Sequence, residues 1–291
     1  MDILSPRPKR LCRLPKFKPL PIVMESNGEI YKYQGFFDGF TVRIPEKQDK
    51  KSIVSMGCFG KGSLSKSFPT FDGSSEKPEI IRRRQMERRK KWSESNKTGE
   101  KRKIIVLPDS DDENDYFTNL QATYDIDECG DKETTNLMLE EAFFLKNAIG
   151  CLDVHHEDKI LDDDRAWKLF SESDPFFQRN YAVYYHFRSK NWVVKPGIKF
   201  GGDYLLYKEG PQFYHASYVV MIKNQINNDP LNTTSLIGFQ RMCETSGKEL
   251  LICSVSLPRE FISPDDLPNV TIKEILMKRW VSSQEREENT I

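Results

Sequence analysis

Two apolar runs separated by a Gly-Pro break constrain this chain more than any other feature of its sequence. Residues Asp203–Tyr207 and Ala216–Met221 carry aromatic and β-branched side chains at a density typical of strands. Between them, Gly210-Pro211 can continue neither a helix nor a strand. The segment therefore predicts two strands joined by a turn or short loop, with Tyr207 closing the first strand and His215 opening the second.

Tyr207 and His215, at the two ends of this loop, form the first candidate site. A phenol and an imidazole placed there can converge on one substrate atom. Lys248 is a third candidate, because it follows a predicted helix at 233–245 and starts a predicted buried strand at 250–255. A plainer interpretation is also open. Tyrosine at a strand end is usually a half-buried packing residue, and histidine beside a strand is usually at the surface or hydrogen-bonded in a core.

The composition allows a folded core but requires polar segments as well. Of the 291 residues 37% are hydrophobic and 30% are charged, and the net formal charge is zero, so nucleic-acid binding would need local basic patches. The six cysteines form no C-x-x-C pair, which argues against a zinc ribbon or a disulfide framework and suits a reducing compartment. No run of ~18 apolar residues is present, so we expect no membrane span.

The composition and the hydrophobic pattern change several times along the chain. Residues 1–20 are rich in Pro, Lys and Arg and predict an extended tail, whose Pro-Lys-Arg is compatible with nuclear import. From Gly28 to Ile44 apolar and polar residues alternate, which predicts short antiparallel strands, and a charged loop is expected at Gln48–Lys51. Residues 71–134 nearly lack hydrophobic periodicity and carry basic and acidic runs, so we expect a disordered linker or interaction segment. Helical stripes return at Leu137.

Two further motifs suggest functions that their spacing does not favour. Glycines 57, 60 and 62 suggest a phosphate loop, but Lys61 is followed by glycine rather than Ser or Thr, and no strand–loop–helix unit is evident. A glycine-rich turn beside a strand is the better interpretation. The run His155-His156-Glu157-Asp158 offers metal ligands, but adjacent histidines on a loop lack the i,i+4 spacing of a helical zinc site. We therefore expect no metal site there.

Five stretches carry a family resemblance. They are FRSKNWVVKPGIKFG at 187–201, GPQFYHASY at 210–218, GCFGKGSLSKS at 57–67, LEEAFFL at 139–145 and ILMKRWVSSQERE at 275–287. Together they closely resemble the tRNA-intron endonuclease family and, more narrowly, its eukaryotic catalytic subunit that cuts the 5′ splice site of pre-tRNA. The resemblance covers residues of about 28–70 and 137–287.

The resemblance implies a catalytic triad that uses neither metal nor cofactor. Tyr207 would act as general base on the ribose 2′-hydroxyl before the scissile phosphate, and His215 would protonate the departing 5′-oxygen. Lys248 would stabilise charge on the phosphorane. Cleavage would leave a 2′,3′-cyclic phosphate and a 5′-hydroxyl.

General acid–base chemistry adds its own expectations for these residues. An unperturbed phenol has a pKa near ~10 and an imidazole one near ~6.5, so histidine suits proton donation at neutral pH. A phenol needs a cation to lower its pKa before it can act as a base, and we expect Lys248 to do this for Tyr207. Activity is therefore expected to follow a bell-shaped pH profile and to persist in a chelator.

The resemblance also implies the fold and the division into domains. The expected fold class is α/β (α+β), with two small mixed α/β domains and a disordered insertion. The predicted parts are an extended tail at 1–27, an N-terminal α/β domain at 28–70 plus 137–175, a disordered charged linker at 71–136, and a C-terminal endonuclease domain at 176–287.

Substrate, partners and two further site residues follow from the same resemblance. Arg241 and Trp280 match family positions that hold an extruded base between them. Their plainer roles would be a helix surface charge and a C-terminal packing anchor. The expected substrate is an intron-containing pre-tRNA. The expected partners are a second catalytic subunit for the 3′ site and two non-catalytic subunits in a nuclear heterotetramer.

Two other classes of function remain to be weighed. The alternative is a non-catalytic RNA-binding or assembly subunit on the same fold. Loss of Tyr207, His215 or Lys248 would have favoured it, but all three are present. A metal-dependent nuclease would need clustered carboxylates near the strands, and Asp203 is the only acid within the core of that region. The residues present favour the metal-free endonuclease.

Overall fold

The computed structural model describes residues 6–8, 18–62, 134–157, 159–224, 233–258 and 263–278, together with the backbone of two strands elsewhere. One compact unit comprises Met1–Pro69 and Thr134–Ile291, and a second comprises Thr70–Glu133. In the second unit β4 (Lys101–Ile104) pairs antiparallel with β5 (Thr123–Ile126). Most of the predicted linker lies outside the described residues. The domain boundaries drawn from the sequence stay predictions.

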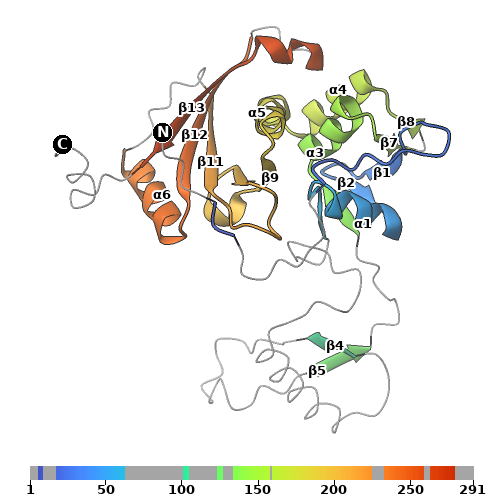
Figure 1. Cartoon of the computed structure of the whole chain (residues 1–291), viewed down its shortest axis with the longest axis horizontal. Coiled ribbons are helices and arrows are strands. Elements are labelled where there is room, and N and C mark those ends of the chain that lie inside the picture. Colours follow the sequence, from blue (N-terminus) through green and yellow to red (C-terminus); the bar gives the residue numbers. More distant parts are fainter. Residues whose placement is uncertain are drawn as a thin grey trace. The chain divides into compact units, whose positions relative to one another are not determined.

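A six-stranded sheet organises the N-terminal part of the first unit (Figure 1). Its order is β3-β6-β2-β1-β7-β8, and only the β1–β7 pair is parallel among these described strands. Alternation along β2 buries Val42 and Ile44 and exposes Arg43, as expected for a sheet with one face against a core. The strands are β1 Tyr33–Phe37, β2 Val42–Ile44, β3 Lys61–Gly62, β6 Thr135–Leu137, β7 Leu152–His156 and β8 Lys159–Ile160.

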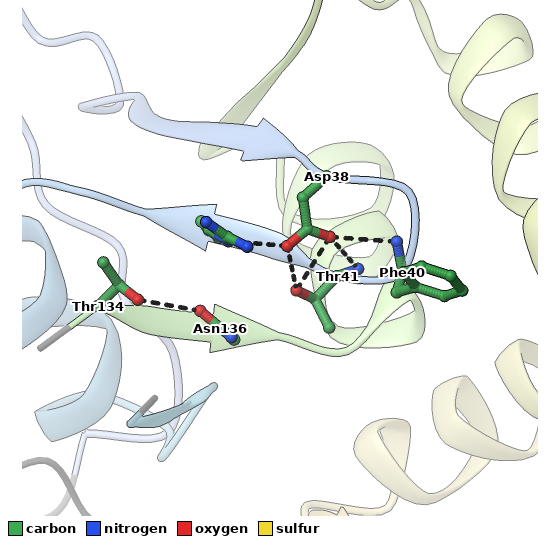
Figure 2. A network of polar contacts seen from close by, with 6 residues as sticks. Asp38, Phe40, Thr41, Thr134 and Asn136 are labelled. Carbon is green, nitrogen blue, oxygen red and sulfur yellow. Dashed lines mark hydrogen bonds and ion pairs between the residues drawn. The ribbon is translucent and has the colours of Figure 1, made fainter. Parts of the chain in front are cut away.

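The turn between β1 and β2 is fixed by Asp38 (Figure 2). Its Oδ1 accepts the backbone N–H groups of Phe40 and Thr41 at 3.1 and 2.8 Å, and its Oδ2 accepts Arg43 Nε at 2.7 Å. Burial opposes ionisation, but these hydrogen bonds prevail and lower the pKa of Asp38. The turn leaves the Phe40 side chain 83% exposed.

A five-stranded sheet organises the C-terminal part of the first unit. Its order is β13-β12-β11-β10-β9, with β11 and β12 parallel and the other neighbours antiparallel. The two strands predicted around the Gly-Pro loop are β10 and β11, which are antiparallel neighbours, so the strand pair is confirmed. His215 does not open the second strand as predicted, because β11 begins at Tyr218 and His215 lies in the loop before it. The strands are β9 Val193–Pro196, β10 Tyr204–Tyr207, β11 Tyr218–Asn224, β12 Glu249–Ser256 and β13 Thr271–Met277.

Helices connect the two sheets through one continuous aromatic core (Figure 1). At its centre the Phe143 ring lies 5.1 Å from that of Trp167 and 5.0 Å from that of Tyr181, so these aromatic side chains form core. A smaller cluster covers the opposite face of the five-stranded sheet, under α6 (Thr233–Thr245). No described helix has the length and apolar character needed to cross a bilayer. The core helices are α3 Leu139–Phe143, the π-helical turn η1 Phe144–Ala148, α4 Asp163–Ser173 and α5 Phe177–Ser189.

The charged loop predicted at Gln48–Lys51 is wrong, because these residues belong to helix α1 (Lys47–Ser55). Two of its charged residues, Asp49 and Lys50, are buried. Asp49 is 3% exposed and accepts a hydrogen bond from the Tyr31 hydroxyl at 3.0 Å. Ile53 and Val54 are buried on the same short helix. A distant partner for the carboxylate allows Asp49 to be buried on a helix rather than solvated in a loop.

The adjacent histidines also differ from their predicted loop, because both end strand β7. His155 stacks on Phe36 at 5.0 Å between ring centroids, and its Nε2 lies 2.5 Å from Gln34 Oε1. Among the described residues, no three His, Cys, Asp or Glu side chains gather as metal ligands.

Two buried cations hold the glycine-rich segment in place. Lys195 Nζ donates to the Gly60 carbonyl at 2.8 Å and to Glu141 Oε1 at 3.0 Å, while Glu141 Oε2 accepts the Gly60 N–H. Arg188 donates to the Gly57 carbonyl at 2.9 Å. Gly57 and Gly60 have φ of +86° and +76°, where side chains are strained. The segment is therefore a turn built into the core.

The buried carboxyl group of Glu140 should make stability depend on pH. Burial raises the pKa of Glu140 to about 7 from 4.5, although the Tyr204 hydroxyl donates to its Oε1 at 2.9 Å. The folded chain thus holds this proton more tightly than the unfolded chain, so stability falls as pH rises from 4.5 through about 7. At ~1.4 kcal/mol per pKa unit, the loss is roughly 3 kcal/mol.

Glu140→Gln is expected to remove this pH dependence, because the amide cannot ionise yet still accepts the Tyr204 hydroxyl. The variant should match the wild type at pH ~5 and exceed its free energy of unfolding by roughly 2–3 kcal/mol at pH ~8. Urea unfolding at both pH values measures this difference. Glu172→Gln, at an exposed position of α4, is the matched control. An equal pH dependence in wild type and Glu140→Gln would contradict the assignment.

Candidate functional site

The three candidate residues lie at one edge of the five-stranded sheet, where three neighbouring strands begin or end. Tyr207 ends β10, and the chain returns through the loop carrying His215 into β11. Because β12 runs parallel to β11, its first residue, Glu249, lies at the same edge, directly after Lys248. Two backbone bonds fix this edge: Ser217 N–H donates to the Leu206 carbonyl at 2.9 Å, and the Ser217 carbonyl accepts the Glu249 N–H at 3.0 Å.

Tyr207 and Lys248 project from the same face of the sheet. Side chains alternate along a strand, so Tyr207 shares the face of Leu205 and Lys248 that of Leu250. Leu205 and Leu250 both pair with Val219 and lie in the cluster under α6. Two strand spacings separate β10 from β12, or ~10 Å. Within the residues described, no hydrogen bond joins the three candidate side chains directly.

Lys248 is placed by the way α6 ends. Lys248 N–H donates to the Cys243 carbonyl and Gly247 N–H to the Glu244 carbonyl, both at 2.9 Å, which is a Schellman motif. Gly247 takes the left-handed conformation that this motif needs, with φ +66°. The predicted helix–Gly–Lys–strand order is confirmed in this structure. The turn brings Lys248 from the helix end to the sheet edge.

The Lys248 ammonium is held against the sheet rather than extended into solvent. Its Nζ lies 4.0 Å from the centre of the Phe200 ring and donates to the Ser246 carbonyl at 2.9 Å. Burial lowers the pKa of Lys248, against a smaller opposing effect of the neighbouring Cys243. Two intramolecular contacts therefore position the cation before any substrate arrives.

His215 presents its side chain to solvent while its backbone is fixed. Phe213 and Tyr214 N–H groups both donate to the Gly210 carbonyl, which closes the loop after Pro211. His215 N–H donates to the carbonyl of Arg7 at 3.1 Å. The imidazole is exposed and can reach an incoming group.

The Tyr207 phenol differs from the sequence-based expectation. Its side chain packs half-buried against the cluster under α6, and burial raises its pKa. A neighbouring cation would lower the pKa, but Lys248 stands two strands away and does not offset the burial. In the chain alone, Tyr207 therefore stays protonated at neutral pH.

The resemblance predicts two further site residues, Arg241 and Trp280. Arg241 is exposed on α6, and Trp280 lies outside the described residues, so their base-holding role stays a prediction. His186 contacts a carboxylate instead of the candidate residues: its Nε2 lies 2.6 Å from Glu274 Oε1.

Two residues at this edge escape sequence reasoning. Phe200 forms the platform for Lys248 from a 3-10 turn, Ile198–Phe200, and Arg7 reaches the loop from the N-terminal segment. No sequence pattern around Phe200 or Arg7 predicts that either residue lies beside the candidate site. Phe200 belongs to a stretch that already stood out by resemblance, whereas Arg7 lies in a segment expected to be an extended tail.

Comparisons with known proteins identify a family and relatives of this chain. A family model described as "tRNA intron endonuclease, catalytic C-terminal domain" matches residues 177–261, which contain all three candidates. Three subunits of tRNA-splicing endonucleases are similar over more than half of this chain. Sen2 of Gallus gallus is 42% identical over 54% of this chain and 36% of its own length, SEN2 of Saccharomyces cerevisiae is 34% identical over 56% and 46%, and Sen2-1 of Arabidopsis thaliana is 30% identical over 55% and 70%. The match therefore spans only 36% of the chicken relative.

Proposed function

Because the chain belongs to the tRNA-intron endonuclease family and is of the Sen2 type, we propose that it is a catalytic subunit that cuts intron-containing pre-tRNA. More narrowly, we propose cleavage at the 5′ exon–intron junction. One observation carries the proposal: Tyr207, His215 and Lys248 meet at a single sheet edge, with an exposed imidazole and a preplaced cation.

The proposed mechanism is attack by the ribose 2′-hydroxyl on the adjacent phosphorus. Tyr207 takes the proton of the 2′-hydroxyl, the 2′-oxygen forms a bond to phosphorus, and the bond to the 5′-oxygen breaks. His215 gives its proton to the departing 5′-oxygen, so a 2′,3′-cyclic phosphate and a 5′-hydroxyl result. Lys248 offsets the charge that builds on the phosphorane oxygens.

The raised pKa of Tyr207 adds a condition to this mechanism. A phenol protonated at neutral pH accepts a proton only if its anion is stabilised as the reaction proceeds. A ribose-phosphate unit bound over the ends of β10, β11 and β12 would exclude water from Tyr207 and strengthen the field of Lys248. Substrate binding is thus proposed to activate the base.

The rest of the assembly is proposed on the same basis. A second catalytic subunit would cut the 3′ junction, and two non-catalytic subunits would complete a heterotetramer that acts in the nucleus. Arg241 and Trp280 would hold a base at the site of the other catalytic subunit. Recognition would rest on the shape of the pre-tRNA body rather than on its base sequence.

The test uses the assembled complex and a matched pair of side chains. Tyr207→Phe keeps the half-buried ring and removes only the phenolic oxygen, whereas Tyr185→Phe does the same on α5, outside the site. In a chelator, the complex with Tyr207→Phe should lose the 5′ cut and keep the 3′ cut, while Tyr185→Phe should keep both. Wild-type 5′ exons should end in a 2′,3′-cyclic phosphate.

Substrate chemistry provides an independent arm. A single 2′-deoxy nucleotide before the 5′ junction removes the proposed nucleophile and should block that cut alone. Cleavage of the deoxy junction would exclude 2′-hydroxyl attack. Unchanged cleavage by Tyr207→Phe at both junctions would favour the alternative, a non-catalytic RNA-binding or assembly subunit.

A further inference from the structure

A short segment near the N-terminus lies beside the candidate site. Pro8 forms an antiparallel bridge with Tyr214, and the Arg7 carbonyl accepts the N–H of His215 at 3.1 Å, which places the first blue segment of Figure 1 against the loop before β11. The sequence Pro6-Arg7-Pro8 favours this geometry. A residue before proline is biased to extended backbone, and both prolines lack the N–H that a helix would use.

The Arg7 side chain extends from this segment toward the residue before Lys248. A Cβ atom built on Gly247 would lie 3.4 Å from Arg7 Nη1, so the guanidinium rests against the turn that places Lys248. Gly247 has no side chain to displace it. Two cations, one from the N-terminal segment and one from the end of α6, thus occupy the same edge as His215.

The positive charges of Arg7 and Lys248 suit this edge to binding an anion. Arg7 is exposed, and within the described ranges no carboxylate forms an ion pair with it. Neighbouring like charges repel, and an anion bound between them turns that repulsion into attraction. A guanidinium presents parallel N–H donors that match the oxygens of a phosphate. The backbone bond to His215 leaves these donors available.

We propose that Arg7 binds a phosphate of the RNA backbone next to the scissile one. This inference rests on the proposed function, because it takes the scissile phosphate to lie between Tyr207 and Lys248. Arg7 is a substrate-binding residue in this scheme and takes no part in proton transfer. The N-terminal segment thereby becomes part of the catalytic site.

Binding can be measured without cleavage. The complex binds a pre-tRNA whose 5′ junction carries a 2′-deoxy nucleotide, and fluorescence anisotropy gives Kd as a function of salt. Arg7→Gln keeps the backbone bond to His215 and is expected to raise Kd about tenfold, the effect of losing one charge-assisted hydrogen bond. The slope of log Kd against log salt should become shallower by ~0.7–0.9, the contribution of one neutralised phosphate. Arg7→Lys should keep most of the slope, and Lys168→Gln, an exposed position of α4, should change neither quantity.

A neutral methylphosphonate placed in turn at each phosphate flanking the junction locates the contact. At one position the methylphosphonate should weaken binding of the wild type but add nothing to Arg7→Gln. Additive losses at both positions, or a wild-type Kd for Arg7→Gln, would overturn the proposal. Failure of the proposed function looks different, since a wild-type complex would then leave the all-ribose 5′ junction intact whatever Arg7 binds.

Discussion

His215→Ala is expected to slow cleavage at the 5′ junction by about 10²–10⁴-fold, the usual contribution of a general acid. The 5′-oxygen of ribose is a poor leaving group as an alkoxide, so an unassisted departure carries the cost of that charge. Cleavage at the 3′ junction should stay at the wild-type rate, because the second catalytic subunit supplies that site. Single-turnover cleavage of one pre-tRNA gives both rates in one sample.

The fold should tolerate this change. The His215 side chain is exposed, and its N–H bond to the Arg7 carbonyl belongs to the backbone, so alanine keeps it. Stability should change by less than about 0.5 kcal/mol. The matched control is His186→Ala, which removes an imidazole on α5 that contacts Glu274 of β13. This variant should leave both cleavage rates unchanged.

A sulfur substitution separates proton donation from positioning. Replacing the 5′-oxygen of the leaving nucleotide by sulfur gives a thiolate leaving group. Thiols are far stronger acids than alcohols (the cysteine thiol has a pKa near ~8.5), so the thiolate departs without a proton donor. The His215→Ala complex should therefore cut the sulfur substrate within about tenfold of the wild-type rate. A defect as large as that with the oxygen substrate would show that His215 positions the substrate rather than protonates it.

Local turn chemistry explains why the candidate site could be predicted from the sequence. Gly210-Pro211 ends one strand, and Ser246-Gly247 ends α6, so the order strand–Tyr–loop–His–strand and helix–Gly–Lys–strand follows from neighbours in the chain. The sheet then brings these ends together, because β11 and β12 are parallel. The triad positions needed no distant information beyond that pairing.

Features that depend on partners distant in the chain could not be predicted from the sequence. Lys195 lies in an apolar strand, and its two partners, Glu141 and Gly60, are 54 and 135 residues away. Asp49 looks solvated until Tyr31 is placed beside it. The pKa of Tyr207 rises because the side chain packs against the cluster under α6. Burial and long-range pairing, rather than secondary structure, separate the sequence-based account from the observed one.

Lys195→Met is expected to destabilise the folded chain by about 3–5 kcal/mol, because it leaves a buried carboxylate without its cation. Lys195 Nζ pairs with Glu141 Oε1 at 3.0 Å, and the two side chains are 10% and 1% exposed. The same ammonium satisfies the Gly60 carbonyl, so methionine also leaves that acceptor unpaired. Methionine fills a similar volume, which keeps the loss electrostatic rather than one of packing.

Urea unfolding of Lys195→Met against Lys32→Met measures this expectation. Lys32 pairs with Asp153 at 3.6 Å with its own side chain 58% exposed, and loss of such a surface pair should cost at most about 1 kcal/mol. Similar losses for the two variants would contradict the buried role of Lys195.

A double-mutant cycle identifies the unpaired charge as the cause. Glu141→Gln removes the carboxylate charge while its amide oxygen can still accept one of the N–H groups of Gly60 and Met138 that Glu141 Oε2 now accepts. Alone, Glu141→Gln leaves the buried ammonium of Lys195 without its anionic partner and should destabilise the chain. Combined with Lys195→Met it removes both charges, so the double variant should be more stable than the sum of the single losses predicts, by about 1–3 kcal/mol. Additive losses would mean that packing, and not the ion pair, joins β9 to α3 and to the glycine-rich turn.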